Sequence, residues 1–352
     1  MNRHKLVQFF EKRRKAGAPL VLATVYDTEG STYSKPGARM LIDADGVFQG
    51  MLSGGCLEGD LAIRAQVAVE SGQAQYADYN LADSNDELWG LGVGCDGRMR
   101  ILLQPLAATS NYEPFASIAR TELGLRRTLA VTLIEPELSD VTAGATLLLA
   151  DNAVQNLGFA EALCEQIIRS APVKDATDFV GLANLEWQGR PISLLYSIIH
   201  PTPRVLVLGG GLDAEPVVSM AAELGWLITV VDHRPAYIEN NNFRGADRKL
   251  CIDADLLAQE VELDQFDLAI VMSHHLASDR KYLAQLSTSR VPYIGLLGPK
   301  ARRRRLLDEL GECAHDLRGR LHGPAGLDLG GSGPAAIALS IVAQMQQYLS
   351  VD

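Results

Sequence analysis

Cys56 is the residue whose neighbours most directly suggest chemistry. It lies in the stretch SGGCLEGD (residues 53–60), after Gly54 and Gly55 and two residues before Glu58. A strand is expected before this turn and a helix after it, so the thiol would lie near the positive end of a helix dipole. That position favours a reactive thiolate, which Glu58 would oppose if it lay close. The stretch predicts either a thiol that binds a soft metal or sulfur, or a small residue packed at a turn.

The other cysteines give weaker signals. Cys95 lies in LGVGCDG, a second glycine-flanked position, but no C-x-x-C pair is present, which argues against a structural zinc site. Cys164, Cys251 and Cys313 fall in helix or strand patterns and are expected in the core.

A second candidate site follows the stretch VLVLGGGLDA. Gly209, Gly211 and Ala214 form a G-x-G-x-x-A pattern after a strand, and Asp232 ends the next strand about 20 residues later. In that pattern the glycines admit a pyrophosphate and the acid binds a ribose hydroxyl. Asp213 would repel a pyrophosphate. The pattern therefore leaves open NAD or NADP binding, another anionic ligand, or a scaffold without a nucleotide.

Histidines and basic residues follow later strands. His274 and His275 are expected at the end of a strand, where alternation would let only one face a ligand. Lys300 and the arginine run that begins at Arg302 open a predicted helix and could cover an anionic group. His322 lies in a glycine-rich stretch and is expected to be structural.

The elements that must position these residues fall into two groups. Residues 1–198 mix strands with a few helices and predict an α+β domain. Residues 199–352 alternate strands and helices and predict a Rossmann-like doubly wound parallel sheet. Pro201 and Pro203 interrupt any regular element between them, so the boundary is expected near residue 200.

Composition excludes several classes of protein. The 352 residues include 43 acidic and 32 basic side chains, a net charge of −11, which argues against a nucleic-acid binder. No apolar run approaches the roughly 20 residues that span a bilayer, and the N-terminus has no secretory signal pattern. Five cysteines without paired spacing are typical of a reducing compartment, so a cytoplasmic location is expected.

Taken together, the motifs carry a family resemblance. SGGCLEGD, LGVGCDG, VLGGG, VVDHRP, SHHLASD, YIGLLGPKARRRR and LHGPAGLDLGGSGPAAIALSIVAQM occur in this order along nearly the whole chain. The chain resembles the xanthine dehydrogenase accessory factor family, also called XdhC/CoxI. It departs from the family pattern at His275, where an Asp is usual, at Pro299 and Lys300, where Ser and Arg are common, and at Gly333, where Thr is usual.

The resemblance implies a cofactor chaperone rather than a conventional enzyme. Such proteins bind the molybdenum cofactor (molybdopterin) of a molybdenum hydroxylase, support its sulfuration with sulfur from a cysteine desulfurase, and support its insertion into the apo-enzyme. It implies that Cys56 ligates molybdenum or holds sulfur near it. The expected cofactor-binding residues are Gly54, Gly55, Cys56, Glu58, Gly209, Gly211, Asp232, His274, Lys300 and Arg302.

The expected partners are the apo-enzyme, the desulfurase and a second copy of the chain, with no nucleic acid or membrane. Two other functions stay open at this point. One is an NAD(P)-dependent oxidoreductase, although no Tyr-x-x-x-Lys pair follows the glycine turn. The other is a nucleotide-sensing regulatory protein.

Overall fold

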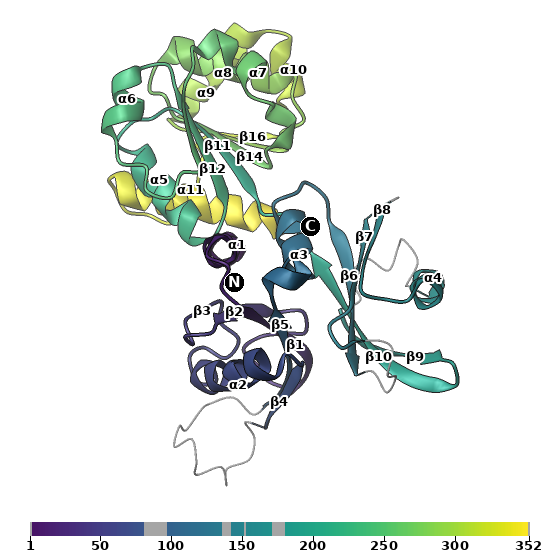
Figure 1. The fold of residues 1–352 in the computed structure, drawn as a ribbon. Coiled ribbons are helices and arrows are strands. Elements are labelled where there is room, and N and C mark those ends of the chain that lie inside the picture. Colours follow the sequence, from purple (N-terminus) through teal and green to yellow (C-terminus); the bar gives the residue numbers. More distant parts are fainter. Residues whose placement is uncertain (1, 81–96, 136–141, 151–152, 171–179, 351–352) are drawn as a thin grey trace. The chain divides into compact units, whose positions relative to one another are not determined.

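The chain forms two compact units, Met1–Pro201 and Thr202–Asp352. Their elements are drawn in Figure 1. The structure, a computed structural model, describes residues 2–80, 97–135, 142–150, 153–170 and 180–350.

The first unit is built on two five-stranded antiparallel sheets. One sheet has the order β3-β2-β1-β5-β4 and contains β1 (Leu20–Gly30), β2 (Arg39–Asp43), β3 (Phe48–Gln49), β4 (Gln75–Asn80) and β5 (Gly97–Leu106). The other has the order β8-β7-β6-β10-β9 and contains β6 (Thr128–Glu135), β7 (Thr146–Ala150), β8 (Ala153–Leu157), β9 (Gly181–Trp187) and β10 (Arg190–Ile199).

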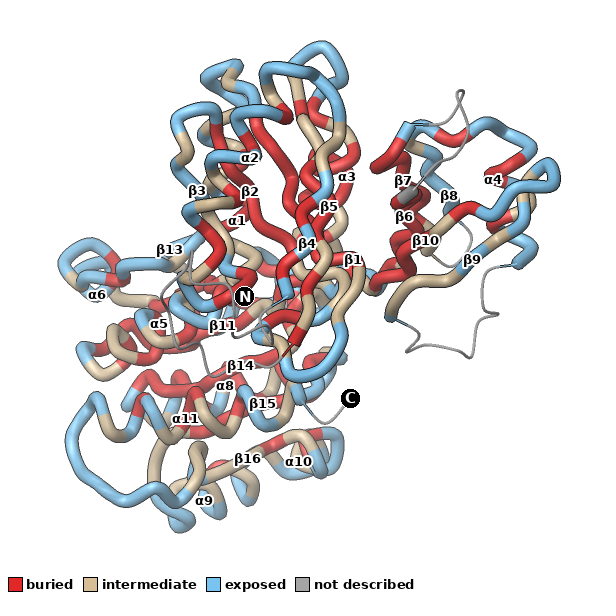
Figure 2. Tube along the Cα trace, turned by 90° about the horizontal axis from the view of Figure 1, so that it is seen from below, coloured by how far each residue is buried: buried red, intermediate tan, exposed pale blue. Residues whose placement is uncertain are grey.

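Helices cover these sheets because the strand side chains alternate between two apolar faces. The helices are α1 (Arg3–Lys15), α2 (Glu58–Ser71), α3 (Phe115–Glu122) and α4 (Glu161–Ser170). On β1, Val21 and Val25 belong to the core beneath α2, whereas Leu20 and Leu22 belong to the core that α1 and α3 share. Buried residues accordingly run along β1, β2 and β5 in Figure 2. The first unit is the expected α+β domain.

The second unit contains one parallel sheet of six strands in the order β13-β12-β11-β14-β15-β16. Its strands are β11 (Arg204–Leu208), β12 (Leu227–Asp232), β13 (Arg248–Cys251), β14 (Leu268–Val271), β15 (Tyr293–Leu296) and β16 (Leu321–His322). Its helices are α5 (Ala214–Glu223), α6 (Pro235–Asn240), α7 (Leu257–Glu260), α8 (Leu276–Ser287), α9 (Lys300–Leu310), α10 (Cys313–Asp316) and α11 (Pro334–Leu349).

Both faces of this sheet are covered. Val205 and Val207 of β11 join the core formed with α5 and α11, while Leu206 and Leu208 join the core formed with α7, α8 and α9. The strand order reverses between β11 and β14, which is the switch point where doubly wound sheets hold ligands. The Rossmann-like prediction for the second unit is confirmed.

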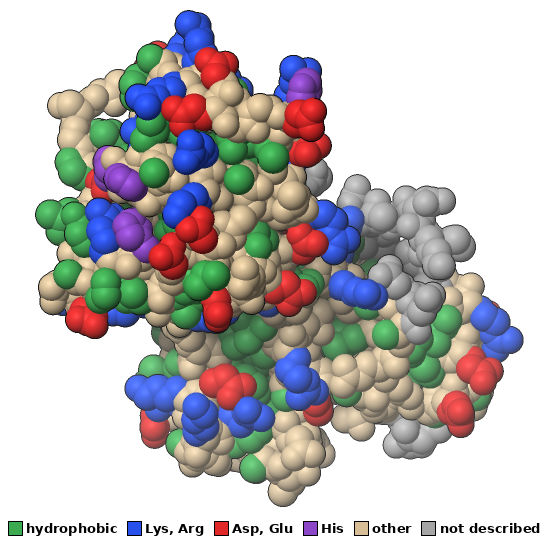
Figure 3. Space-filling view, turned by 90° about the horizontal axis from the view of Figure 1, so that it is seen from above, with side chains coloured by type: hydrophobic (Ala, Val, Ile, Leu, Met, Phe, Trp, Pro, Cys, Tyr) green, Lys and Arg blue, Asp and Glu red, His purple; other side chains and the backbone are tan. Residues whose placement is uncertain are grey.

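The surface agrees with the mixed charge of the composition. On the face drawn in Figure 3, Lys and Arg side chains are interspersed with Asp and Glu, without a broad basic area. No helix among the described residues is both long and apolar enough to cross a bilayer.

Candidate functional site

The Cys56 loop, defined as residues 52–57, is organised around a buried carboxylate. Glu58, the first residue of α2, is 2% exposed. Its Oε1 accepts hydrogen bonds from the backbone N–H groups of Leu52 (2.8 Å) and Ser53 (2.9 Å), and its Oε2 accepts from Ser53 Oγ (2.5 Å) and Gly55 N (3.0 Å). Burial pushes the pKa of Glu58 upward, but these hydrogen bonds outweigh it and hold the pKa below its ordinary value.

The glycines let the loop turn back on Glu58. Gly54 and Gly55 have φ of 79° and 110°, a region that other residues rarely adopt. Ser53 Oγ accepts from Leu57 N at 2.8 Å, which ties the end of the loop to its beginning. A Cβ on Gly55 would meet no atom within 4 Å, so this side of the loop is open. The glycine turn therefore has a fixed shape and an accessible backbone.

Cys56 is half-buried at the edge of the core beneath α2, two residues before the helix begins. Glu58 directs its hydrogen bonds at the loop backbone and Ser53 rather than at the thiol. Cys95 lies outside the described residues. Among the residues that are described, no three His, Cys, Asp or Glu side chains lie together as an ion site.

The prediction for the remaining cysteines is only partly right. Cys164 is buried in α4, as expected, and Cys313 is half-buried. Cys251, however, is exposed at the end of β13, because β13 is an edge strand with three of its four residues exposed. Placing Cys251 in the core was wrong.

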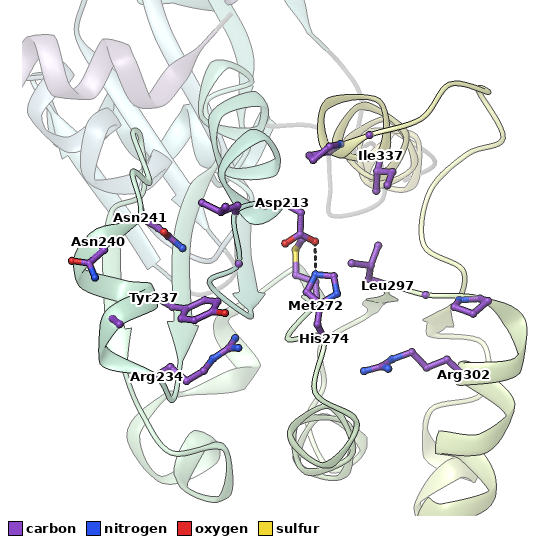
Figure 4. A pocket seen from close by; sticks show the side chains of 17 residues that line it. Asp213, Arg234, Tyr237, Asn240, Asn241, Met272, His274, Leu297, Arg302 and Ile337 are labelled. Atoms are coloured by element: carbon purple, nitrogen blue, oxygen red, sulfur yellow. Dashed lines mark hydrogen bonds and ion pairs between the residues drawn. The ribbon is translucent and has the colours of Figure 1, made fainter.

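A pocket of about 990 Å³ lies at the carboxyl edge of the second unit's sheet, beside the switch point. Figure 4 shows its side chains. It is lined by the turns after β11, β12, β14 and β15 and by the start of α11, and all its lining residues belong to Thr202–Asp352. The volume lies near the upper end of the range typical of small-molecule and cofactor pockets.

Gly209 and Gly211 form the turn that opens this pocket. Gly209 is buried with φ of 126°, and a Cβ there would lie 2.5 Å from the carbonyl carbon of Met272. The absence of a side chain therefore lets β11 approach the turn after β14. Gly211 lines the pocket, and a Cβ there would lie 2.6 Å from Asp213 Oδ1.

Asp232 was predicted to bind a ribose hydroxyl, but in the structure its carboxylate is bound by donors of the protein itself. It is 0% exposed; its Oδ1 accepts from Arg234 N and Nε, both at 2.9 Å, and its Oδ2 accepts from Gly210 N and Arg234 Nη2, both at 2.7 Å. Burial raises the pKa of Asp232, but these bonds outweigh it and leave the pKa below its ordinary value. Because a carboxylate has about four acceptor positions, none is left for a ribose in this structure.

The two adjacent histidines have separate roles, as expected, although neither lies on the strand. Both lie in the turn after β14, where His274 has φ of 59°. His274 lines the pocket, and its Nε2 lies 2.7 Å from Oδ2 of Asp213. Asp213, the acid expected to repel a pyrophosphate, therefore has a hydrogen-bonding partner in the pocket. His275 is the N-cap of α8, and its Nδ1 accepts from Ser278 N at 3.3 Å. An Asp at position 275 would cap the helix in the same way.

Arg302 lies on the pocket and Lys300 does not. Arg302 donates from Nη2 to Oδ2 of Asp279 at 2.6 Å, and the other oxygen of this 1%-exposed carboxylate accepts from Ser273 Oγ and N. Lys300 lines a separate hollow of about 290 Å³ together with Arg303. Lys300 was expected to bind the same ligand as Arg302, but it does not line this pocket, because neighbouring residues of a helix point in different directions.

His322 is a structural residue, as expected. Its ring stacks on Tyr293 with centroids 4.5 Å apart, and burial together with Arg303 lowers its pKa.

Sequence reasoning missed Arg234 and Tyr237 as pocket residues. The guanidinium of Arg234 lies 3.6 Å from the ring centroid of Tyr237. The signal was present in VVDHRP, since an arginine two residues after the acid can fold back on it.

Known proteins similar to this chain cover both units. A family model described as the XdhC Rossmann domain matches residues 205–345, and one described as the XdhC and CoxI family matches residues 13–80. The chain is 30% identical over 329 residues to a Bacillus subtilis protein named as a probable subunit of xanthine dehydrogenase, spanning 93% of this chain and 92% of that protein. It is 27% identical over 164 residues to the uncharacterized protein YqeB of Escherichia coli, spanning 45% of this chain and 30% of that protein.

A solved structure agrees with these matches. The crystal structure of a protein described as a xanthine dehydrogenase from Bacillus halodurans superposes with a TM-score of 0.78 and 28% identity, covering 99% of this chain and 96% of that one. The similarity to the Bacillus subtilis protein extends over nearly the full length of both chains, which is enough to assign this chain to a family. The chain belongs to the XdhC and CoxI family, as its motifs predict.

Proposed function

We propose that this chain is an accessory factor of a molybdenum hydroxylase such as xanthine dehydrogenase, and that it holds the molybdenum cofactor beside Cys56. Family membership supports the accessory role, and the Bacillus subtilis relative is itself named as a probable subunit of xanthine dehydrogenase. The observation that carries the proposal is the Cys56 loop, which holds a half-buried thiol on a backbone fixed by Glu58.

The loop suits a cargo that must be released again. The cofactor supplies two sulfur ligands of its own, so a single soft thiolate would complete its attachment without a full protein ligand set. Gly55 offers backbone without a side chain on the open side of the loop, where a bulky pterin could approach. Sulfuration with sulfur from a cysteine desulfurase and insertion into the apo-enzyme would then act on this bound cargo.

Replacing Cys56 with alanine is expected to lower molybdenum retention at least about tenfold, because removing a ligand should exceed the tenfold or greater loss that outer partners cause. Parent and variant would be purified from cells that make the cofactor, and molybdenum per chain measured by mass spectrometry after gel filtration. Cys251→Ala removes an exposed thiol in the other unit and should retain the parent level. Equal retention in Cys56→Ala and parent would remove Cys56 from the site.

The proposed partners are the apo-enzyme, a cysteine desulfurase and a second copy of the chain. Affinity purification from the native host would identify the first two, and light scattering would report the third. Association that persists in Cys56→Ala would show that partner binding does not need the cargo.

A second proposed function concerns the second unit, which we infer binds a dinucleotide in its pocket. The supporting observation is the pocket at the switch point, opened by Gly211 and lined by Arg234 and His274. Such a ligand would make this unit a nucleotide-responsive part of the accessory factor.

Gly211→Val is expected to weaken dinucleotide binding at least tenfold with little change in Tm. The new side chain would displace the carboxylate of Asp213 and fill the approach to the turn. The fold should tolerate this because the atom displaced is the end of a side chain and not backbone. Calorimetry with NADH and NADPH would measure the affinities, with Ala258→Val, a change at an exposed site of α7, as the control. Parent protein that binds neither dinucleotide at millimolar concentration would contradict this second proposal.

A further inference from the structure

The turn after β12 presents a cation where dinucleotide-binding sheets commonly present an acid. Asp232 lies at the end of β12, as that pattern requires, but its exposed fraction is 0% whereas the Arg234 side chain is 31% exposed. A ligand entering the pocket at this turn therefore meets the guanidinium and not the carboxylate.

Arg234 is held in one orientation. Nε and Nη2 donate to the two oxygens of Asp232, and Nη2 also lies 3.4 Å from the carbonyl oxygen of Ser273. Tyr237 packs against the guanidinium plane with its ring centroid 3.6 Å away. Nη1 has no hydrogen-bond partner within the described part of the chain, so its donors remain for a ligand.

The neighbouring groups favour an anion over a neutral hydroxyl. Figure 4 shows Arg234 and Arg302 extending their guanidinium groups toward His274 from opposite sides of the pocket. Asp213 also faces the pocket, but its Oδ2 lies 2.7 Å from Nε2 of His274, so the two side chains pair with each other. Asp232 and Asp279 are buried behind their arginines. Among the lining residues that the structure describes, Arg234 and Arg302 are the arginines and Asp213 is the acid.

We propose that this pocket recognises its ligand through a phosphomonoester that binds Arg234, and that it discriminates against the same ligand with a free ribose hydroxyl at that position. The inference rests on the ligand-binding function proposed for the second unit. A fixed guanidinium suits a phosphate dianion, whereas a ribose diol would need the acceptor positions of Asp232 that Arg234 and Gly210 occupy.

This chemistry has two sources. One is the 2′-phosphate of NADP(H), in which case the adenosine half lies beside Tyr237 and the pyrophosphate near Gly211. The other is the terminal phosphate of molybdopterin, in which case the cargo itself occupies the second unit. Both are phosphomonoesters, and both require Arg234.

The test compares pairs of ligands that differ by one phosphate. On the full-length parent, 2′,5′-ADP and NADPH are expected to bind at least tenfold more tightly than AMP and NADH, measured by calorimetry at fixed ionic strength. Purified molybdenum cofactor in its monophosphate form is then titrated against bound 2′,5′-ADP. Displacement shows that the cofactor phosphate uses the same site, and lack of displacement assigns the site to the nucleotide.

Three variants separate recognition from folding. Arg234→Ala should lower the affinity for NADPH at least tenfold and leave that for NADH unchanged or higher, because Asp232 is released. Arg234→Lys keeps a charge against Asp232 and should show an intermediate preference, which covers the case in which the alanine variant does not fold. Arg244→Ala, at an exposed site outside the pocket, should match the parent.

Distinct results overturn distinct proposals. If the parent binds NADH as tightly as NADPH, or if Arg234→Lys lowers both equally, phosphomonoester recognition is wrong and the dinucleotide site stands. If no nucleotide binds but molybdenum cofactor does, and Arg234→Lys weakens it, the dinucleotide proposal fails and the recognition of a phosphomonoester stands. If neither binds, both proposals fail.

Discussion

Gly209→Val is expected to destabilise the second unit by about 3–5 kcal/mol. The φ of 126° is strained for any residue with a Cβ, at about 1–3 kcal/mol, and the new side chain would overlap the Met272 backbone, at a further 1–3 kcal/mol or more. Because the neighbour is backbone, it cannot rotate away. For a unit of this size the Tm should fall by about 10 °C or more.

Hydrogen exchange followed by mass spectrometry would assign this effect to a unit. Peptides from Thr202–Asp352 should exchange faster, while those from Met1–Pro201 should not. Gly319→Val is the matched control, because Gly319 also has a positive φ, 79°, but a Cβ there would meet nothing within 4 Å. Equal losses in the two variants would show that the approach of Gly209 to Met272 does not matter.

Glu58→Gln is expected to lower the free energy of unfolding by about 2–4 kcal/mol at neutral pH and to reduce molybdenum retention together with it. An amide has one oxygen, so at least one backbone N–H that donates to Glu58 would face another donor instead. The loop would then lose the shape that positions Cys56. Glu70→Gln, at an exposed site of the same helix, should leave both quantities near the parent values.

The effect of Glu58→Gln should depend on pH with a definite sign. The pKa of Glu58 is lowered in the folded chain, so its stabilisation is present above the unfolded value near 4.5 and is lost as pH falls through the folded value. Denaturant unfolding of parent and variant between about pH 7 and pH 3 would therefore show two curves that converge toward acid. A stability difference that stays constant with pH would contradict the role of the charged carboxylate.

The sequence predicted most securely those features whose patterns are local. The glycine turn from Gly209 to Gly211, the strand before it and the helix after it follow one another directly along the chain, and each is present. The loop around Cys56 was likewise predictable as a turn before a helix, and Gly72 ends that helix with φ of 64°. In both places the residues that make up the sequence motif are also the residues that determine the local backbone conformation.

Features that depend on distant partners were not predictable. The sequence allowed Asp232 to face a ribose, and the outcome depends on Arg234, whose extended backbone before Pro235 brings its N–H and side chain back to the carboxylate. Cys251 has a strand-like sequence, and only the order of the strands makes β13 an edge. Lys300 and Arg302 lie two residues apart in one run, yet they line different hollows.

The two pocket arginines, Arg234 and Arg302, are each held by a buried carboxylate, and this affects both the entropy and the rate of ligand binding. Asp232 and Asp279 each accept hydrogen bonds on both oxygens, and each carboxylate holds one arginine, Arg234 or Arg302, in place. Fixing a long arginine side chain opposes binding by up to about 2 kcal/mol when it happens as the ligand arrives. Here the ordering accompanies folding, so a ligand meets donors that are already in place. Association should therefore proceed in a single fast phase, without a slower rearrangement step.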